Sequence, residues 1–218
     1  MNLSLEGKIA IVTGGSKGIG RAAALALAQE GVDVTICARG MEDLEDAAAE
    51  IRTATGRKVL AVQADMGNPD DIKNLIATTV TELGGVDILI NNAVNSKAAP
   101  FMDLADEDWL NHINVKVMGY VRCSREVIPH MQARGGGRII HIGGMAARQA
   151  NTLANTTASP TRRSQTWPRI SLMRSRPTEY WSTASILAQQ GLSGRNGVWS
   201  RAPSTPISQL KRLKTVPS

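Results

Sequence analysis

The sequence predicts an α/β domain with a doubly wound parallel sheet over residues 1–150, followed by a region that is incomplete or irregular. Short apolar runs alternate with segments of helical periodicity. The first apolar run passes into the first helical segment through a glycine-rich turn. Charge and composition then change sharply near residue 150. With 218 residues and 42% hydrophobic content, the chain is long enough to bury a core of this kind.

The elements of the domain follow one another as strand and helix. Strands are expected at residues 8–12, 33–37, 58–63, 86–90 and 138–142. Helices are expected at residues 19–29, 42–55, 69–83 and 106–133, the third beginning after Asn68 as a possible N-cap. Because the strand runs are almost continuously apolar, both faces of the sheet should be covered. Right-handed crossovers then place helices on both faces of a parallel sheet.

The region after residue 150 differs in charge. Residues 1–150 hold 15 Lys and Arg against 18 Asp and Glu, a net charge of −3, whereas residues 151–218 hold 10 against one, a net charge of +9. The second region also has three of the four tryptophans and six of the nine prolines. We therefore divide the chain into a domain at 1–150 and a basic, atypical tail at 151–218, whose composition favours disorder or loose packing.

Several protein classes are disfavoured by the sequence. No apolar run approaches the roughly 18 to 20 residues of a membrane-spanning helix, and the N-terminal residues lack the pattern of a targeting segment. We therefore expect a soluble, cytoplasmic protein without a membrane partner. Cys37 and Cys123 have no CxxC spacing and no histidine cluster nearby, so neither a disulfide framework nor a metal site is predicted.

The glycine-rich turn is the first candidate site. The segment Thr13-Gly-Gly-Ser-Lys-Gly-Ile-Gly20 lies between the first strand and the first helix. Glycines there permit a tight turn and let backbone amides approach a diphosphate, while the helix N-terminus favours the anion. An ordinary strand-to-helix connection is the alternative for the turn taken alone. The candidate cofactor-binding residues of the turn are Gly14, Ser16, Lys17, Gly18, Ile19 and Gly20.

The spacing Thr-Gly-x-x-x-Gly-x-Gly resembles the fingerprint of the short-chain dehydrogenase/reductase family, and the resemblance extends over residues 1–150. It implies a Rossmann-like fold and a nicotinamide dinucleotide cofactor. The further cofactor-binding residues that it implies are Asp65 and Met66 after the third strand, and Asn91 and Ala93 after the fourth, where Val94 replaces the family's glycine. It also implies a catalytic role for Asn114, which matches the family's helix asparagine that supports a proton-relay water.

The residue at the end of the second strand indicates which dinucleotide is bound. An acidic side chain there would accept a hydrogen bond from the ribose 2′-hydroxyl of NAD and repel the 2′-phosphate of NADP. This chain has Ala38-Arg39 instead, and Lys17 adds a second cation. The charges predict NADP, with NAD less favoured. The alternative is that both side chains are simply solvated.

The residues that the family uses for catalysis are not recognisable. Its serine aligns with Gly144, its tyrosine near Thr157 and its lysine near Thr161, and none of these can polarise or protonate a carbonyl. His141 lies in a strand pattern and is better explained as a packed histidine than as a general acid. Tyr180 has no lysine at the required spacing. The resemblance therefore implies a carbonyl or alcohol substrate, while the residues predict little or no dehydrogenase activity.

The unusual tail suggests a shift of reading frame. Codons for residues 182–193, read two bases later, can encode Val-Asn-x-Val-His-Pro-Gly-Ala-Thr-Arg-Thr-Glu. This shifted sequence resembles the family's sixth strand and the loop after it. In the frame as given, that strand and the helix with the Tyr/Lys pair are expected to be missing. The coding DNA decides this hypothesis. Two alternative functions stay open: a non-catalytic dinucleotide-binding or interaction protein, and a less favoured nucleic-acid-binding role of the basic tail. The resemblance also implies a homo-oligomer, because relatives commonly associate through two long helices, of which only residues 106–133 are recognisable here.

Overall fold

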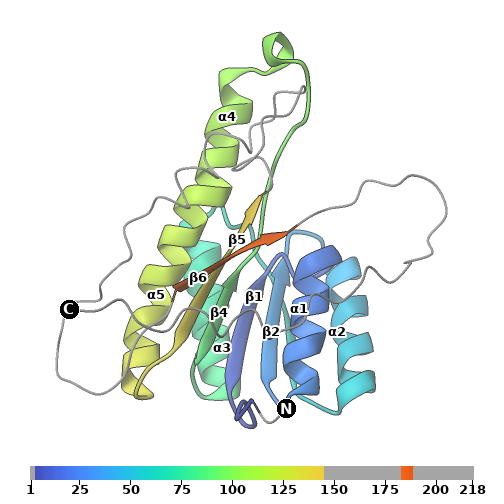
Figure 1. Cartoon of the computed structure of the whole chain (residues 1–218), viewed down its shortest axis with the longest axis vertical. Coiled ribbons are helices and arrows are strands. Elements are labelled where there is room, and N and C mark those ends of the chain that lie inside the picture. The colour runs from blue at the N-terminus through green and yellow to red at the C-terminus, as the bar shows by residue number, and fades with distance from the viewer. Residues whose placement is uncertain (1–2, 145–182, 189–218) are drawn as a thin grey trace, which may run out of the picture.

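The computed structural model describes residues 3–144 and 183–188, and these residues form a parallel sheet with helices on both faces (Figure 1). The sheet has six strands in the order β3-β2-β1-β4-β5-β6, and every neighbouring pair is parallel. The strands are β1 (Ile9–Thr13), β2 (Asp33–Ala38), β3 (Val59–Gln63), β4 (Ile88–Asn91), β5 (Arg138–Gly144) and β6 (Thr183–Ala188). The predicted fold class, a Rossmann-like doubly wound parallel sheet, is confirmed.

The helices form one layer on each face of this sheet. Alternation along β1 separates the layers, because Ala10 and Val12 belong to one buried cluster and Ile11 to the other. The first cluster contains residues of α1 and α2, and the second contains residues of α3 and α5. The helices are α1 (Gly18–Gln29), α2 (Met41–Thr55), α3 (Pro69–Leu83), α4 (Asp106–His112) and α5 (Gly119–Ala133). A 3-10 turn, η1 (Phe101–Asp103), precedes α4.

The long helix expected at residues 106–133 is divided in the structure. A π-helical segment, η2 (Ile113–Met118), lies between α4 and α5. A π-helical turn inside an α-helix shifts the side chains that follow it around the helix axis, and such turns often occur at functional sites. The other helices begin and end within one residue of the expected bounds. The N-cap predicted for α3 is confirmed, since the Asn68 side chain accepts a hydrogen bond of 3.0 Å from the backbone N–H of Asp70.

The sixth strand corrects the sequence analysis, which expected this strand to be missing in the frame as given. Thr183–Ala188 pairs in parallel with β5, from Ile139 opposite Thr183 to Gly144 opposite Ala188. Without β6, the outer edge of β5 would leave a row of backbone groups unpaired. The segment Thr-Ala-Ser-Ile-Leu-Ala contains no charge and no proline, so it can satisfy this edge. The other residues of the tail lie outside the described part of the chain.

The order of the strands indicates where a ligand would bind. The chain runs outward from β1 through β2 to β3 and then returns to β4, on the other side of β1. In open sheets of this kind, ligands bind beyond the carboxyl ends of the strands where the order reverses. That point is occupied by the glycine turn after β1 and by the segment after β4. Every helix within residues 3–144 and 183–188 is too short or too polar to span a membrane.

Candidate functional site

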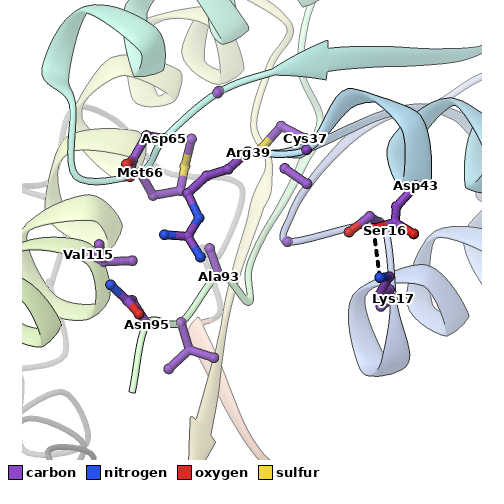
Figure 2. A pocket seen from close by; sticks show the side chains of 15 residues that line it. Ser16, Lys17, Cys37, Arg39, Asp43, Asp65, Met66, Ala93, Asn95 and Val115 are labelled. Atoms are coloured by element: carbon purple, nitrogen blue, oxygen red, sulfur yellow. Dashed lines mark ion pairs between the residues drawn. The ribbon is translucent and has the colours of Figure 1, made fainter. Parts of the chain in front are cut away.

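A cavity of about 310 Å³ opens at the carboxyl ends of β1, β2, β3 and β4. Figure 2 shows its walls, which come from the glycine turn, the start of α2, the loop after β3 and the segment after β4. The predicted residues that line it are Gly14, Ser16, Lys17, Arg39, Asp65, Met66 and Ala93. Of the other predicted residues, Gly18, Ile19 and Gly20 begin helix α1 beside it, while Asn91 and Asn114 are not among the lining residues.

Gly14 and Gly20 are among the positions of the glycine turn that have no room for a side chain. Gly14 has a φ of +67°, a conformation that residues with a Cβ rarely adopt. A Cβ at residue 20 would overlap the carbonyl oxygen of Gly14 and would lie 2.6 Å from the side-chain nitrogen of Asn92. The N-terminus of α1 therefore packs directly on the turn. Free backbone N–H groups at a helix N-terminus are suited to binding an anion.

Asn92, which the sequence analysis did not select, braces this turn. Its side-chain N–H group donates to the carbonyl oxygens of Thr13 and Gly14, each at 3.0 Å. The hydroxyl of Thr13 in turn accepts from the backbone N–H groups of Asn92 at 2.9 Å and Ala93 at 3.0 Å. These four hydrogen bonds tie the end of β4 to the end of β1. They fix the position of the glycines relative to the cavity.

Asn91, the neighbouring asparagine, is directed elsewhere. It is fully buried at the end of β4, with its side-chain nitrogen 3.4 Å from Ser124 Oγ and 3.2 Å from His141 Nδ1. Its Oδ1 atom has no hydrogen-bond partner among the described residues. The structure thus places Asn91 between β4, β5 and α5. It supports the sheet behind the cavity and does not line it.

Two cations, Lys17 and Arg39, and two carboxylates, Asp43 and Asp65, line the cavity wall. Arg39 directly follows β2 and is exposed, and its guanidinium points into the cavity in Figure 2. Its backbone oxygen is held by the side chain of Gln63 at 2.8 Å. Over residues 3–144 and 183–188, no carboxylate forms an ion pair with Arg39. Lys17, by contrast, pairs with Asp43 of α2 at 2.6 Å.

The loop after β3 forms another wall and is held by two carboxylates, one in the loop and one in the first turn of α3. Asp65 Oδ1 accepts from the backbone N–H of Gly67 at 2.7 Å, and the backbone N–H of Asp65 donates to Asp71 at 2.8 Å. Met66 is buried, and a Cβ at Gly119 would lie 2.8 Å from its carbonyl oxygen. The first residue of α5 is therefore pressed against the loop. Asp65 and Met66 shape the cavity through this backbone.

Asn114 connects the π-helical segment to the same loop. Its side-chain nitrogen donates to the carbonyl oxygen of Gly67 at 3.0 Å, and its side-chain oxygen accepts from Arg122 at 2.7 Å. Both ends of the amide are thus occupied by protein groups. Val115, the next residue, lines the cavity. Asn114 holds the helix in the position that brings Val115 to the cavity wall.

A row of buried polar groups lies behind the end of β5. Lys116 donates to the carbonyl oxygen of Ile142 at 2.6 Å and to the hydroxyl of Tyr120. Burial lowers the pKa of Lys116 to about 8 and raises the pKa of Tyr120. The ring of His141 stacks on the ring of Tyr120, with the two ring centroids 5.4 Å apart. Burial, with a smaller contribution from the charge of Lys116, lowers the pKa of His141 from 6.5 to about 4.

The pKa of His141 predicts a loss of stability in acid. In the unfolded chain this histidine takes up a proton near pH 6.5, whereas in the fold it stays neutral to about pH 4. The unfolded state therefore binds more protons between these values, and the free energy of unfolding should fall by up to about 1.4 kcal/mol per pH unit as the pH drops. His112, whose pKa is also lowered by burial, acts in the same direction. Urea unfolding from about pH 7.5 to about pH 5 measures this slope, and His141→Asn should reduce it. An unchanged slope in that variant would contradict the assignment.

The residues aligned with the family's catalytic groups are described only in part. Gly144 ends β5 and has no hydroxyl. The positions of Thr157, Thr161 and Tyr180 lie outside the described residues. At the end of β5, the described titratable groups are Lys116, Tyr120 and His141, which bind one another or the backbone.

Comparison with known proteins shows related sequences and folds. The family model described as short chain dehydrogenase matches residues 8–158. The chain is 35% identical over 144 residues to a 3-oxoacyl-(acyl-carrier-protein) reductase of Staphylococcus epidermidis, covering 66% of this chain and 59% of that protein. It is also 35% identical over 144 residues to dehydrogenase/reductase SDR family member 4 of Oryctolagus cuniculus, covering 66% and 55%. The chain thus spans less than two thirds of the length of these relatives.

A solved structure resembles the fold closely. The L-sorbose reductase of Gluconobacter frateurii, crystallised with NADPH and L-sorbose, superimposes with a TM-score of 0.72 at 34% identity. The match covers 75% of this chain and 62% of the reductase. A short-chain alcohol dehydrogenase, described as putative, from Sinorhizobium meliloti matches with a TM-score of 0.65 at 29% identity, covering 72% and 60%.

Proposed function

Because the chain belongs to the short-chain dehydrogenase family, we propose that residues 1–150 bind a nicotinamide dinucleotide, with NADP(H) preferred to NAD(H). The observation that carries this proposal is the contact between Gly20 and the carbonyl of Gly14 at the start of α1. It leaves the first N–H groups of the helix free of side chains that would block a diphosphate. When bound, the cofactor supplies or accepts a hydride.

The preference for NADP(H) rests on charge. The structure has Arg39 where an acidic residue would bind the 2′-hydroxyl of NAD, and its guanidinium enters the cavity. A guanidinium can donate two parallel hydrogen bonds to a phosphate. The related L-sorbose reductase was crystallised with NADPH, which supports the same choice for this chain. Asp65 and Ala93 would border the remainder of the cofactor, since both line the cavity.

The reaction of the family implies a carbonyl or alcohol substrate, and two of the relatives named above are described as reductases, one of a 3-oxoacyl-(acyl-carrier-protein) and one of L-sorbose. Proton transfer to a carbonyl needs an acid beside the substrate oxygen. Gly144 offers none, and the described titratable groups behind β5 are engaged with one another. We therefore propose that this chain binds the cofactor and turns over substrate slowly or not at all. Its buried free cysteines are compatible with action in the reducing cytoplasm.

Reversal of the charge at residue 39 tests the cofactor proposal. In Arg39→Asp, we expect the affinity for NADPH to fall by about 10- to 100-fold, because hydrogen bonds to a charged group contribute about 1.5–3 kcal/mol. The affinity for NADH should change by less than about threefold, because NADH has no 2′-phosphate. Isothermal titration calorimetry measures both. Lys73→Asp, which reverses an exposed charge on α3 away from the cavity, is the matched control. Equal losses for NADPH and NADH in Arg39→Asp would refute the preference.

A turnover assay separates the enzyme from a non-catalytic dinucleotide-binding protein. NADPH oxidation should be followed with a panel of ketones at NADPH concentrations that saturate the enzyme. Cofactor binding without ketone-dependent oxidation supports the non-catalytic protein. Ketone-dependent rates above about 1 per second, in the range of ordinary enzymes, would show that other residues replace the family's acid.

A further inference from the structure

A carboxylate shares the wall of the proposed cofactor cavity with the two cations. Asp43, in the first turn of α2, lines the cavity together with Lys17 and Arg39. Its Oδ2 atom lies 2.6 Å from Lys17 Nζ. Figure 2 shows this ion pair beside α2, whereas the guanidinium of Arg39 lies apart from it, towards Met66 and Asn95. One of the two cations is thus already neutralised, and the other is not.

We propose that Asp43 determines how strongly the site prefers NADP(H), by holding Lys17 away from the cofactor phosphate and by repelling that phosphate with its own charge. The inference rests on the function proposed above. It adds a specificity-determining residue on α2 to the glycine turn and to Arg39. A single carboxylate would then moderate the preference that the two cations create.

The ion pair between Lys17 and Asp43 is weak because it is exposed. The side chains of Lys17 and Asp43 are 70% and 56% exposed, so water and salt screen their attraction. An exposed pair of this kind is weak enough for a phosphate to compete for the lysine. Competition leaves the carboxylate of Asp43 without its cation and close to a phosphate of nearly two negative charges. Whether Lys17 stays paired with Asp43 or turns to the phosphate, the affinity for the phosphate is lower than in a site without Asp43.

The position of Asp43 at the N-terminus of α2 adds to its effect on phosphate binding. Asp43 lies in the first turn of α2, and the N-terminus of a helix attracts anions. In this structure Gly40, the residue before the helix, also lines the cavity. The end of α2 could therefore contribute to binding a phosphate. Asp43 and Glu42 occupy its first turn instead and offset that attraction.

The test replaces the carboxylate by its uncharged isostere. In Asp43→Asn, the ratio of NADPH affinity to NADH affinity should rise by about three- to tenfold, as expected for removal of one screened charge. Calorimetry should measure the two cofactors and also adenosine 2′,5′-bisphosphate and AMP, which differ by the 2′-phosphate alone. Asp46→Asn is the matched control, because it removes the same charge from the same helix at an exposed position that does not line the cavity. It should change the ratio by less than about twofold.

A second substitution identifies the partner. Lys17→Met should weaken NADPH binding less in the wild-type chain, where Asp43 holds the lysine, than in the Asp43→Asn background, where it should remove most of the gain. An unchanged ratio in Asp43→Asn, or an equal rise for NADPH and NADH, would overturn the inference while leaving the proposed function intact. If the wild-type chain bound neither cofactor, both the proposed function and this inference would fail.

Discussion

The variant Gly20→Ala should lose most of its affinity for NADPH, by about 100-fold or more, and should lower the free energy of unfolding by about 1–3 kcal/mol. Helix propensity alone predicts the opposite sign, because alanine inside a helix is favoured over glycine by about 1 kcal/mol. The structure reverses this expectation. An alanine Cβ at residue 20 would overlap the carbonyl oxygen of Gly14 and approach Asn92 within 2.6 Å, so the turn must move away from α1.

The control is a second glycine of the same cavity. Gly40 has a φ of −92°, and no atom lies within 4 Å of a Cβ built on it. Gly40→Ala should therefore bind NADPH within about threefold of the wild-type chain and unfold at nearly the same urea concentration. Binding is measured by calorimetry and stability by urea unfolding. If Gly20→Ala and Gly40→Ala behaved alike, close packing on Gly14 would not be the reason for the glycine. If Gly20→Ala failed to fold, the loss of stability would itself exceed the predicted range.

The glycine turn and the sheet were predictable because both depend on local patterns. The strands of a sheet covered on both faces are apolar at successive residues, and glycines between a strand and a helix mark a tight connection. The bounds of α1, α2 and α3 agree with the expected ranges within one residue for the same reason. Arg39 was found as a candidate because it directly follows an apolar strand.

The different roles of Asn91 and Asn92 could not be predicted from the local sequence alone. Successive residues of a strand point to opposite faces, so of two adjacent asparagines only one can face the glycine turn. The phase of this alternation depends on how β4 lies against β1, where Ala10 is opposite Ile88. In the structure Asn92 reaches Gly14, while Asn91 is buried against Ser124. The alternation indicates that the two differ, but the register between the strands decides which one braces the turn.

Other features depend on contacts between distant parts of the chain. The ion pair of Lys17 with Asp43 joins the residue before α1 to the first turn of α2, and no spacing in the sequence predicts it. The strand Thr183–Ala188 joins β5 across the intervening segment because an open edge was available there. Such pairings are decided by which surfaces meet, and their signal in the sequence is weak.

A buried carboxylate at the opposite end of the sheet should be the most sensitive side chain for stability. Asp87 is 5% exposed and precedes β4. It accepts hydrogen bonds from the backbone N–H of Ile9 at 2.9 Å and from Arg134 at 3.0 and 3.2 Å, and Lys8 lies 3.5 Å away. These contacts join β1, β4 and the end of α5. Because the carboxylate is buried, its removal leaves a backbone donor and a partly buried guanidinium without an acceptor.

We expect Asp87→Ala to lower the free energy of unfolding by about 3 kcal/mol, the lower end of the range for a broken buried ion pair, since about a third of the Arg134 side chain is exposed to water. Asp87→Asn keeps an oxygen that can accept from Ile9 and loses only the charge, so its cost should be about 1–2 kcal/mol. Glu45→Ala, which breaks an exposed pair with Arg52, should cost less than about 1 kcal/mol. Urea unfolding of the three variants measures this order. Equal costs for Asp87→Ala and Glu45→Ala would mean that the carboxylate is solvated, and that the strands β1 and β4 are held together by apolar packing and backbone hydrogen bonds.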